Sequence, residues 1–423
     1  MFGMTTGSAR SAIVTGSVRR WSLAAALGLA AAPASAISFN FVEMWQLPRP
    51  DGTVGGRVDA MTLLADGSVA MAGRCVDAAG IENPVLWTDA QQPPIELPTL
   101  GFGGVARSVV YYGASGNDLL IVGGSAFASD GQGAGVFWLV DDTGAHMHQL
   151  VQGNYIGTDV RSVGLLEDEG IYFAVGRVET RNGRLLAAVW SGSDPAEMEL
   201  EVLPGTPAGG DSSATGYIDL KFKDVLVSSI VTPAGGEPQA SYWVRTEDGW
   251  SGPVALPDLG GGSSAFGVAQ GVRNAVFAGE VENEDSEMTP AFWFNGGGVV
   301  STPSLPDGYD GGRVNGIIAI LIGLLVGGGD VTADGISSAA LFTGQPGRPG
   351  VVLDLNLAAW NEAAEGLHLS TTRAGVAITA ADSITITTGG AALDDGGVEQ
   401  PWAGVIRAIP SEAGEVEGPT QRP

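Results

Sequence analysis

Short apolar runs separated by glycine-rich turns are the main pattern along the chain. Between residues 106 and 151, for example, four such runs alternate with turns that contain Gly, Asn or Asp. Runs of this kind, rich in Val, Ile, Leu and aromatics, predict β-strands joined as antiparallel hairpins. The chain has 66 glycines and 23 prolines among 423 residues, which leaves little room for long helices. The pattern therefore predicts an all-β protein.

This strand pattern repeats about every fifty residues. In each unit a glycine or another small residue ends one strand, and an aromatic residue follows in the next strand. Because a four-stranded meander cannot bury both of its faces alone, copies are expected to stack around an axis. A β-solenoid, the alternative, usually has shorter repeats of about 20–30 residues. Seven copies predict a seven-bladed β-propeller of four-stranded antiparallel blades. The repeated aromatics are Trp87, Trp138, Trp190, Trp243, Trp293, Phe342 and Trp402.

The two ends of the repeat region predict how the ring closes. Most units end in a short strand followed by Leu-Pro, as at residues 95–98 and 254–257, but the seventh unit has none. Residues 38–48 end in the same way and have no unit before them. We expect this segment to supply the outer strand of the last blade, which would remove an open sheet edge. One propeller domain is thus expected over residues 37–410, followed by a disordered polar tail at residues 411–423.

Residues 1–36 have the pattern of a secretory signal peptide. Three arginines and no acid precede a short apolar run, and Ala34-Ser35-Ala36 form an A-x-A cleavage site. Cleavage after Ala36 would give a secreted or periplasmic protein. The general secretory route is favoured, and the pair Arg19-Arg20 leaves the twin-arginine route open. A second apolar stretch, residues 317–326, is too short for a membrane helix, which needs about 20 residues, so no membrane span is predicted.

The net charge of the chain and the motifs that it lacks exclude several classes of function. The net charge is −27, and removal of residues 1–36 makes it more negative because they carry no acid. Nucleic acid and anionic lipid surfaces are therefore unsuitable partners. The single cysteine, Cys75, excludes an intrachain disulfide. The sequence contains no GxSxG, HExxH or phosphate-loop motif, so it predicts no catalytic residue and no organic cofactor.

Two features outside the repeat are candidates for ligand binding. Residues 280–287 hold five acids between two predicted strands, and carboxylates are suitable ligands for Ca²⁺. Their spacing is not that of a calcium loop, so a solvated loop is the alternative. Trp250 and Trp360 fall outside the aromatic repeat and are candidates for a carbohydrate-binding surface. The candidate Ca²⁺ ligands are Glu280, Glu282, Glu284, Asp285 and Glu287.

Residues 258–294 resemble the extracellular HAF repeat of secreted bacterial proteins. The resemblance implies a structural repeat and supplies no catalytic residue. Ala291 stands where the family usually has a histidine. A distant kelch-like resemblance, through Gly123-Gly124 and the later Trp138, implies the same fold. The positions that match the HAF motif are Leu259, Gly260, Ser264, Ala265, Gly267, Asn274, Gly279 and Ala291-Phe292-Trp293.

Two functions follow as hypotheses. The first is a secreted, non-catalytic propeller that binds an extracellular protein or polysaccharide through blade loops, and the absence of catalytic motifs favours it. The alternative is an extracellular hydrolase or lyase that uses Asp or Glu with Arg around the central channel, since carboxylate pairs need no histidine. An enzyme should have convergent carboxylates and an arginine in one deep pocket. A binding protein should have a broad, shallow surface.

Overall fold

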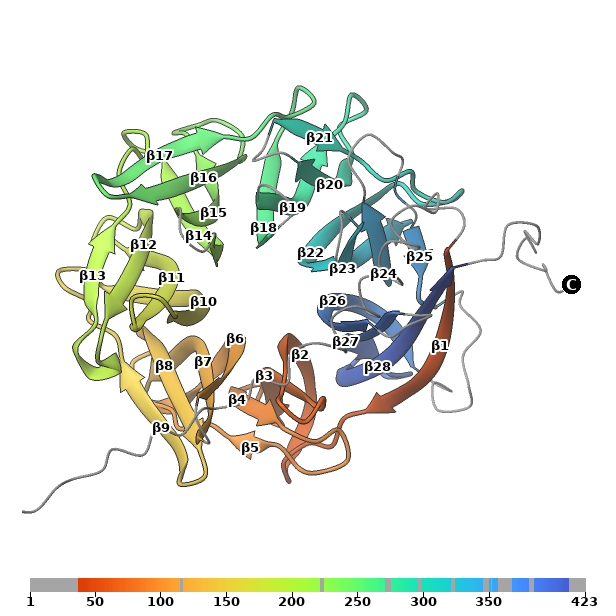
Figure 1. The fold of residues 1–423 in the computed structure, drawn as a ribbon, viewed down its shortest axis with the longest axis horizontal. Helices are drawn as coiled ribbons and strands as arrows, with labels where there is room; N and C mark the ends of the chain where they lie inside the picture. Colours follow the sequence, from red (N-terminus) through yellow and green to blue (C-terminus); the bar gives the residue numbers. More distant parts are fainter. Residues whose placement is uncertain are drawn as a thin grey trace, which may run out of the picture.

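Seven four-stranded antiparallel sheets surround a central axis in the computed structural model, which confirms the predicted propeller (Figure 1). The structure describes residues 37–114, 117–220, 224–270, 275–294, 298–320, 324–344, 350, 352–356, 367–379 and 384–410. The predicted signal peptide, the tail at residues 411–423 and Trp360 lie outside the described residues. No helix in the described part of the chain is long and apolar enough to cross a membrane.

Each blade runs from an inner strand at the axis to an outer strand at the rim (Figure 1). The blades, numbered in chain order, are β2 (Thr53–Leu63), β3 (Val69–Asp77), β4 (Glu82–Trp87) and β5 (Ile95–Glu96); β6 (Gly101–Ala114), β7 (Asn117–Ala128), β8 (Gly133–Asp141) and β9 (Gly144–Gln149); β10 (Gly157–Leu166), β11 (Ile171–Glu179), β12 (Leu185–Gly192) and β13 (Glu199–Val202); β14 (Asp211–Asp219), β15 (Val225–Thr232), β16 (Gln239–Thr246) and β17 (Gly249–Ala255); β18 (Ser263–Gln270), β19 (Ala275–Glu282), β20 (Met288–Phe294) and β21 (Val299–Ser301); β22 (Gly311–Ile320), β23 (Leu324–Ala333), β24 (Ile336–Gly344) and β25 (Val352–Asp354); and β26 (His368–Thr379), β27 (Ile384–Leu393), β28 (Glu399–Pro410) and β1 (Ile37–Gln46).

The first strand of the chain closes the ring, as predicted. β1 pairs antiparallel with β28 along most of its length, from Ile37 opposite Pro410 to Gln46 opposite Trp402. Met44 of β1 is buried in the core of the seventh blade. The outer edge of β28 is thereby covered by a strand more than 350 residues away in sequence.

The repeated tryptophans join neighbouring blades. In the second blade the Trp138 indole N–H donates to the carbonyl oxygen of Pro98, at the end of the first blade, over 2.8 Å. Trp87 makes the same bond to Pro48, directly after β1, over 2.7 Å. The Leu-Pro segments therefore present a carbonyl oxygen to the next blade. Trp402 is also fully buried but departs from this pattern, because its indole donates within its own blade. The remaining bonds of this type are Trp190 to Val151, Trp243 to Pro204 and Trp293 to Pro257.

The repeated glycines mark the closest approach of the first two strands of a blade. A Cβ atom on Gly176 would lie 1.9 Å from the carbonyl oxygen of Asp159, and one on Gly329 would lie 1.8 Å from that of Arg313. No side chain fits at such distances. Beside this contact each inner strand of blades 1–6 contains a β-bulge, which turns one extra residue toward the axis. The bulged residues are Asp59, Arg107, Arg161, Thr215, Phe266 and Asn315.

Candidate functional site: the arginine-lined mouth of the central channel

One face of the ring carries the start of every inner strand, and we call it the front face. In the first blade Thr53, at the start of β2, lies opposite Asp77, at the end of β3. In the third blade Gly157 lies opposite Glu179 in the same way. The turns between the second and third strands therefore lie on this face, next to the segments that connect one blade to the next. The bulged residues occur near the middle of each inner strand.

An axial cavity of about 250 Å³ opens among the inner strands of all seven blades. Its lining includes four arginines and one aspartate, and the bulged residues supply most of the rest. In a chain whose net charge is −27, this is a local excess of positive charge. The lining residues are Arg57, Val58, Asp59, Arg107, Arg161, Thr215, Phe266, Arg313, Asn315 and Thr371.

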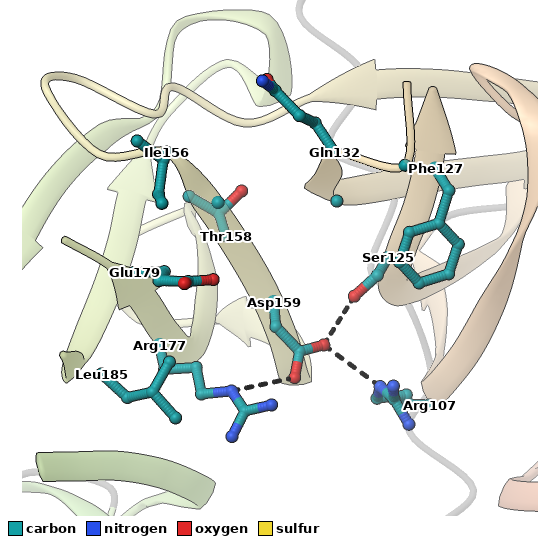
Figure 2. A pocket seen from close by; sticks show the side chains of 13 residues that line it. Arg107, Ser125, Phe127, Gln132, Ile156, Thr158, Asp159, Arg177, Glu179 and Leu185 are labelled. Carbon is teal, nitrogen blue, oxygen red and sulfur yellow. Dashed lines mark hydrogen bonds and ion pairs between the residues drawn. The ribbon is translucent and has the colours of Figure 1, made fainter. Parts of the chain in front are cut away.

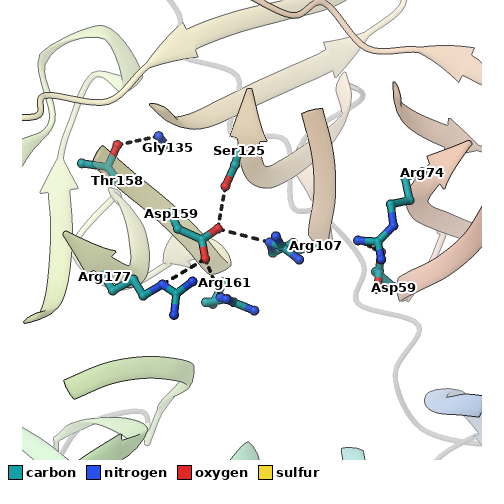
Figure 3. Close-up of polar contacts among 9 residues, drawn as sticks. All are labelled: Asp59, Arg74, Arg107, Ser125, Gly135, Thr158, Asp159, Arg161 and Arg177. Carbon is teal, nitrogen blue, oxygen red and sulfur yellow. Dashed lines mark hydrogen bonds and ion pairs between the residues drawn. The ribbon is translucent and has the colours of Figure 1, made fainter. Parts of the chain in front are cut away.

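Asp159 forms ion pairs with three arginines that belong to two blades (Figure 3). Its Oδ2 atom lies 2.8 Å from Nε of Arg161 and 3.4 Å from Nε of Arg177. Its Oδ1 atom lies 3.2 Å from Nε of Arg107 and accepts a 2.5 Å bond from the Ser125 hydroxyl. Because Arg107 and Ser125 belong to the second blade and Asp159 to the third, this cluster also joins the two blades.

The electrostatics of this cluster keep the aspartate ionised. Burial alone would raise the pKa of Asp159, but Arg107 and Arg161, the Ser125 hydroxyl and Arg177 together lower it below its ordinary value. Burial lowers the pKa of Arg161 to about 10, partly offset by Asp159, and the neighbouring arginines add to the lowering. Three guanidinium groups thus share one carboxylate, and the cluster has an excess of positive charge.

The arginines at the mouth all use the same atom to contact a carboxylate. Nε of Arg57 lies 3.1 Å from Oδ1 of Asp59, and Nε of Arg313 lies 3.0 Å from Oδ1 of Asp330. The Asp59 and Asp330 side chains are 3% and 5% exposed, whereas those of Arg57 and Arg313 are 27% and 45% exposed. Within the described part of the chain, no hydrogen bond or ion pair involves an Nη atom of the arginines at positions 57, 107, 161, 177 and 313. The paired donors that recognise anions are therefore left for a ligand.

A cleft of about 400 Å³ lies between blades 2 and 3 and shares Arg107 with the axial cavity (Figure 2). We call it the 2/3 cleft. Its walls combine apolar side chains, namely Phe127, Ile156 and Leu185, with polar groups. The polar side chains that line it are Arg107, Ser125, Gln132, Thr158, Asp159, Arg177 and Glu179.

The corresponding position between blades 5 and 6 holds a second cleft of about 430 Å³, which we call the 5/6 cleft. It contains Arg313 but is dominated by acids. Burial raises the pKa of Glu280 in this cleft, and Asp330 adds to the rise while Arg313 opposes it. The acids that line it are Glu280, Glu287, Asp310 and Asp330.

The five predicted Ca²⁺ ligands have different surroundings. Glu280 and Glu287 line the 5/6 cleft, and Glu282 accepts a 2.9 Å bond from the backbone N–H of Gly262. Glu284 and Asp285 lie exposed in the turn. Among the residues that the structure describes, no group of three or more His, Cys, Asp and Glu side chains is arranged to hold a metal ion. The Ca²⁺ site therefore stays a prediction.

Trp250 lies on the outer strand β17, away from the axial cavity. Its ring is half-buried and stacks on Phe173, with ring centroids 6.4 Å apart and an interplanar angle of 26°. It packs against the core between blades 3 and 4. A role of Trp250 in carbohydrate binding stays a prediction, and Trp360 lies outside the described residues.

The arginines at the mouth were not singled out from the sequence. The signal that identifies them is their position relative to the repeated glycine. Asp159 lies directly opposite the residue that follows Gly176, and Arg313 lies opposite the residue that follows Gly329. An alignment of the seven units on this glycine would have placed these charged side chains in one layer around the axis.

Comparison with known proteins supports no family assignment. No protein-family model and no curated protein matches the chain. Similar solved structures include AofleA from Arthrobotrys oligospora, at 10% identity over 76% of this chain and 90% of that chain, with a TM-score of 0.43. The WD40 domain of SCAP from fission yeast is similar at 10% identity, over 84% of this chain and 85% of that chain, with a TM-score of 0.38. A thermostable family-43 glycoside hydrolase has 11% identity over 75% and 93%, with a TM-score of 0.37. We transfer no function from likenesses at this level.

Proposed function

We propose that this protein is a secreted, non-catalytic propeller that binds an anionic extracellular ligand, a polysaccharide or a protein, at the front face. The observation that carries the proposal is the arrangement of the arginines around the axial cavity. Each is fixed through Nε by a carboxylate, and none uses its Nη atoms within the described part of the chain. A guanidinium group held in this way is oriented in advance for a carboxylate or a similar anion.

The charge balance at the mouth favours an anionic ligand. Arg107, Arg161 and Arg177 surround one aspartate, so their mutual repulsion is only partly offset. A negative group bound between them would reduce this repulsion in a site that is partly screened from water. The acidic remainder of the chain would repel anions elsewhere, which confines attraction to the mouth.

The Asp159 carboxylate is poorly suited to acid–base catalysis. A general acid or base works best when its pKa lies near the working pH. The pKa of Asp159 is instead lowered by its arginines and Ser125, because its carboxylate accepts hydrogen bonds from Arg107 and Ser125 and forms ion pairs with Arg161 and Arg177. An aspartate in this state orients its neighbours and does not exchange protons readily at neutral pH. This favours binding over turnover at this site.

Export is part of the proposal and is supported by sequence. Residues 1–36 have the pattern of a signal peptide, with arginines, a short apolar run and an A-x-A site. The resemblance of residues 258–294 to the extracellular HAF repeat agrees with this placement. Its matching residues Ala265, Phe292 and Trp293 are fully buried, as expected of a structural repeat.

Binding assays with the mature chain test this proposal. The chain from Ile37 onward is immobilised and titrated with polygalacturonate, dextran sulfate, poly-glutamate and neutral dextran at several salt concentrations. We expect at least one anionic polymer to bind, neutral dextran not to bind, and affinity to fall as salt rises. Arg161→Gln and Arg57→Gln should each weaken binding about tenfold or more.

Arg181→Gln is the matched control, because Arg181 is exposed in the turn after β11, does not line the cavity and loses the same charge. Melting temperatures of all variants verify folding. Equal binding by Arg161→Gln, Arg57→Gln and the unchanged chain would refute the proposal, and so would a failure of every anionic polymer to bind.

A second candidate function rests on Glu280. Its raised pKa and the neighbouring Asp330, paired with Arg313, resemble the division of roles between two carboxylates in glycoside cleavage. The 5/6 cleft would then be the active site of an extracellular hydrolase or lyase. A screen for release of reducing ends from acidic and neutral polysaccharides tests this candidate. Activity that Glu280→Gln abolishes, with an unchanged melting temperature, would establish it, and no product from any polymer would exclude glycoside cleavage among those tested.

A further inference from the structure

We infer that the 2/3 cleft binds a uronate residue of an acidic polysaccharide, that is, a sugar ring bearing a carboxylate. This inference rests on the proposed function, because it assigns the chemical class of the ligand recognised at the front face. It chooses a polysaccharide over an acidic protein.

Two arginines in the cleft are placed to hold the carboxylate. Arg107 and Arg177 reach the cleft from neighbouring blades and contact Asp159 through Nε (Figure 2). Their Nη atoms have no partner in the described part of the chain. Asp159 accepts a hydrogen bond from Arg107 and forms an ion pair with Arg177, so both guanidinium groups are held near the cleft before a ligand arrives. A carboxylate accepts two parallel N–H bonds from such a group.

Apolar side chains line the cleft on both of its sides, Phe127 on the side of blade 2 and Ile156 on the side of blade 3. Phe127, at the end of β7, is half-buried, and Ile156, just before β10, is 42% exposed (Figure 2). A sugar ring has an apolar face made of C–H groups, which packs against an aromatic or aliphatic surface. An acidic peptide could use the arginines but has no need of apolar side chains beside them. The two features together fit an acidic sugar.

The remaining polar groups distinguish a uronate from a sulfate or phosphate ester. Glu179 lines the cleft on the same side as Arg177, two residues further along β11. Its carboxylate would repel a second negative group but accepts hydrogen bonds from hydroxyl groups. Gln132, at the rim, both donates and accepts (Figure 2). A ligand with one carboxylate and several hydroxyls satisfies all of these groups.

The cleft leads toward the axial cavity, which points to a polymer. Arg107 lines both spaces, so a ligand that fills the cleft extends toward Arg161 and Arg57. A second uronate in the same chain would then meet the axial arginines. A volume of about 400 Å³ lies within the range of about 300–1,000 Å³ that is typical of small-ligand sites.

A cleft-filling variant and its counterpart in the other cleft test the inference. A Cβ on Gly157 would meet only Glu179 and the Gly133 carbonyl oxygen, none closer than 3.5 Å, so Gly157→Leu would fill the 2/3 cleft without a backbone clash. Gly311 has the same position in blade 6, where a Cβ would lie 3.1 Å from the Met288 carbonyl oxygen. Gly311→Leu is therefore the matched control. Both are titrated calorimetrically with tetragalacturonate, its methyl ester, a sulfated oligosaccharide of equal length and tetraglutamate.

We expect tetragalacturonate to bind, and Gly157→Leu to weaken its binding at least tenfold. Gly311→Leu should bind it as the unchanged chain does, and the methyl ester should lose at least tenfold. Phe127→Ala, a second variant, should weaken tetragalacturonate binding several-fold and affect tetraglutamate less. If Gly157→Leu does not fold, as judged by its melting curve, Phe127→Ala decides alone.

The outcomes separate this inference from the proposed function. If the sulfated ligand or tetraglutamate binds as well as tetragalacturonate, the front face still binds anions but the uronate inference is wrong. The inference is also wrong if Gly157→Leu folds and binds tetragalacturonate normally. If no anionic ligand binds, the proposed function fails and the inference fails with it.

Discussion

The 2/3 and 5/6 clefts occupy the same place in the repeat but have opposite chemistry. In blade 3 the inner strand carries Asp159 opposite Arg177, and in blade 6 it carries Arg313 opposite Asp330. The neighbouring blade differs as well, because the residue after the repeated glycine is Ser125 in one cleft and Glu280 in the other. The backbone therefore fixes where these side chains lie, and their identity decides the chemistry.

Different surroundings explain the opposite pKa shifts of the two carboxyl groups, because Arg107 and Arg161 lead the lowering at Asp159 whereas burial leads the rise at Glu280. The Ser125 hydroxyl donates to Asp159 and helps to lower its pKa. Glu280 has no proton to donate when ionised, and burial beside Asp330 raises its pKa. The first cleft therefore keeps an ionised carboxylate beside its arginines, while in the second the Glu280 carboxyl group holds its proton to a higher pH than an ordinary glutamate does. The same fold supports a binding site and a potential acid–base site three blades apart.

Removal of the closing strand should abolish both clefts together. Deletion of residues 37–46 exposes the edge of β28 and removes Met44 from its core. We expect a loss larger than the about 3–5 kcal/mol of a single buried aromatic truncation, together with self-association through the open edge. Calorimetric melting and light scattering of the truncated and mature chains measure this. An unchanged melting temperature would show that the ring does not depend on β1.

Among changes confined to one cleft, removal of the Asp159 carboxylate should cause the largest loss of stability. Asp159→Ala leaves three arginines without their shared carboxylate, and the loss of one partner of a buried ion pair costs about 3–5 kcal/mol. Asp330→Ala removes the partner of one arginine and should cost less. Urea unfolding at neutral pH compares the two. Equal losses of unfolding free energy would mean that a carboxylate shared by three arginines stabilises the fold no more than one paired with a single arginine.

Exchange of the charged pair in blade 6 should give that blade the order found in blade 3. The single changes Arg313→Asp and Asp330→Arg each place like charges across β22 and β23, so both should destabilise. The double variant restores an opposite pair, and we expect it to be more stable than the sum of the single losses by about 0.5–3 kcal/mol. Urea unfolding of the three variants closes the cycle. Additive losses would contradict the equivalence of the two positions.

Stability should depend on pH in opposite directions in the two clefts. The folded pKa of Glu280 lies above its ordinary 4.5, so the unfolded chain ionises first and this group lowers stability as pH rises through that window. Glu280→Gln should therefore gain melting temperature relative to the unchanged chain as pH rises from 4 to 7. The folded pKa of Asp159 lies below its ordinary 3.8, so its contribution is present above that value and is lost as pH falls.

Asp159→Asn should accordingly lose most at pH 7, with the difference shrinking toward pH 3. Melting temperatures across this range measure both differences. Glu284→Gln, an exposed change in the turn beside Glu280, is the control and should follow the unchanged chain. The same trend with pH for Glu280→Gln and Asp159→Asn would contradict the contrast between the clefts.

The sequence was sufficient to predict the architecture because the fold imposes local rules. In most blades a glycine lies where the first two strands touch, with the small Ser229 in its place in blade 4, and a buried tryptophan donates to a carbonyl oxygen of the previous blade. Both rules recur at a fixed spacing and are visible without a structure. The exception, Trp402, has the right residue type but a different partner, Ala391, and no spacing reveals that.

The site was less predictable because it depends on neighbours about fifty residues apart. Glu280 belongs to an acidic run that looked like a solvated loop, but the strand β19 extends to Glu282 and places Glu280 against Arg313. Arg107 is one of many arginines until a bulge turns it toward the axis and Asp159 receives it. Which of these side chains are buried, and which groups they contact, is decided only when adjacent blades pack together.

The pairing of β1 with β28 also constrains how the protein reaches its native state. Blades 1 to 6 consist of consecutive strands, so each is able to assemble from local hairpins as soon as its residues are available. The seventh cannot be completed until β28, at the end of the propeller sequence, meets β1, its first strand. Until then the chain is an arc with two unfinished ends, and its aggregation risk is concentrated in that interval. The last contact to form is therefore also the one that makes the mouth of the channel a closed ring.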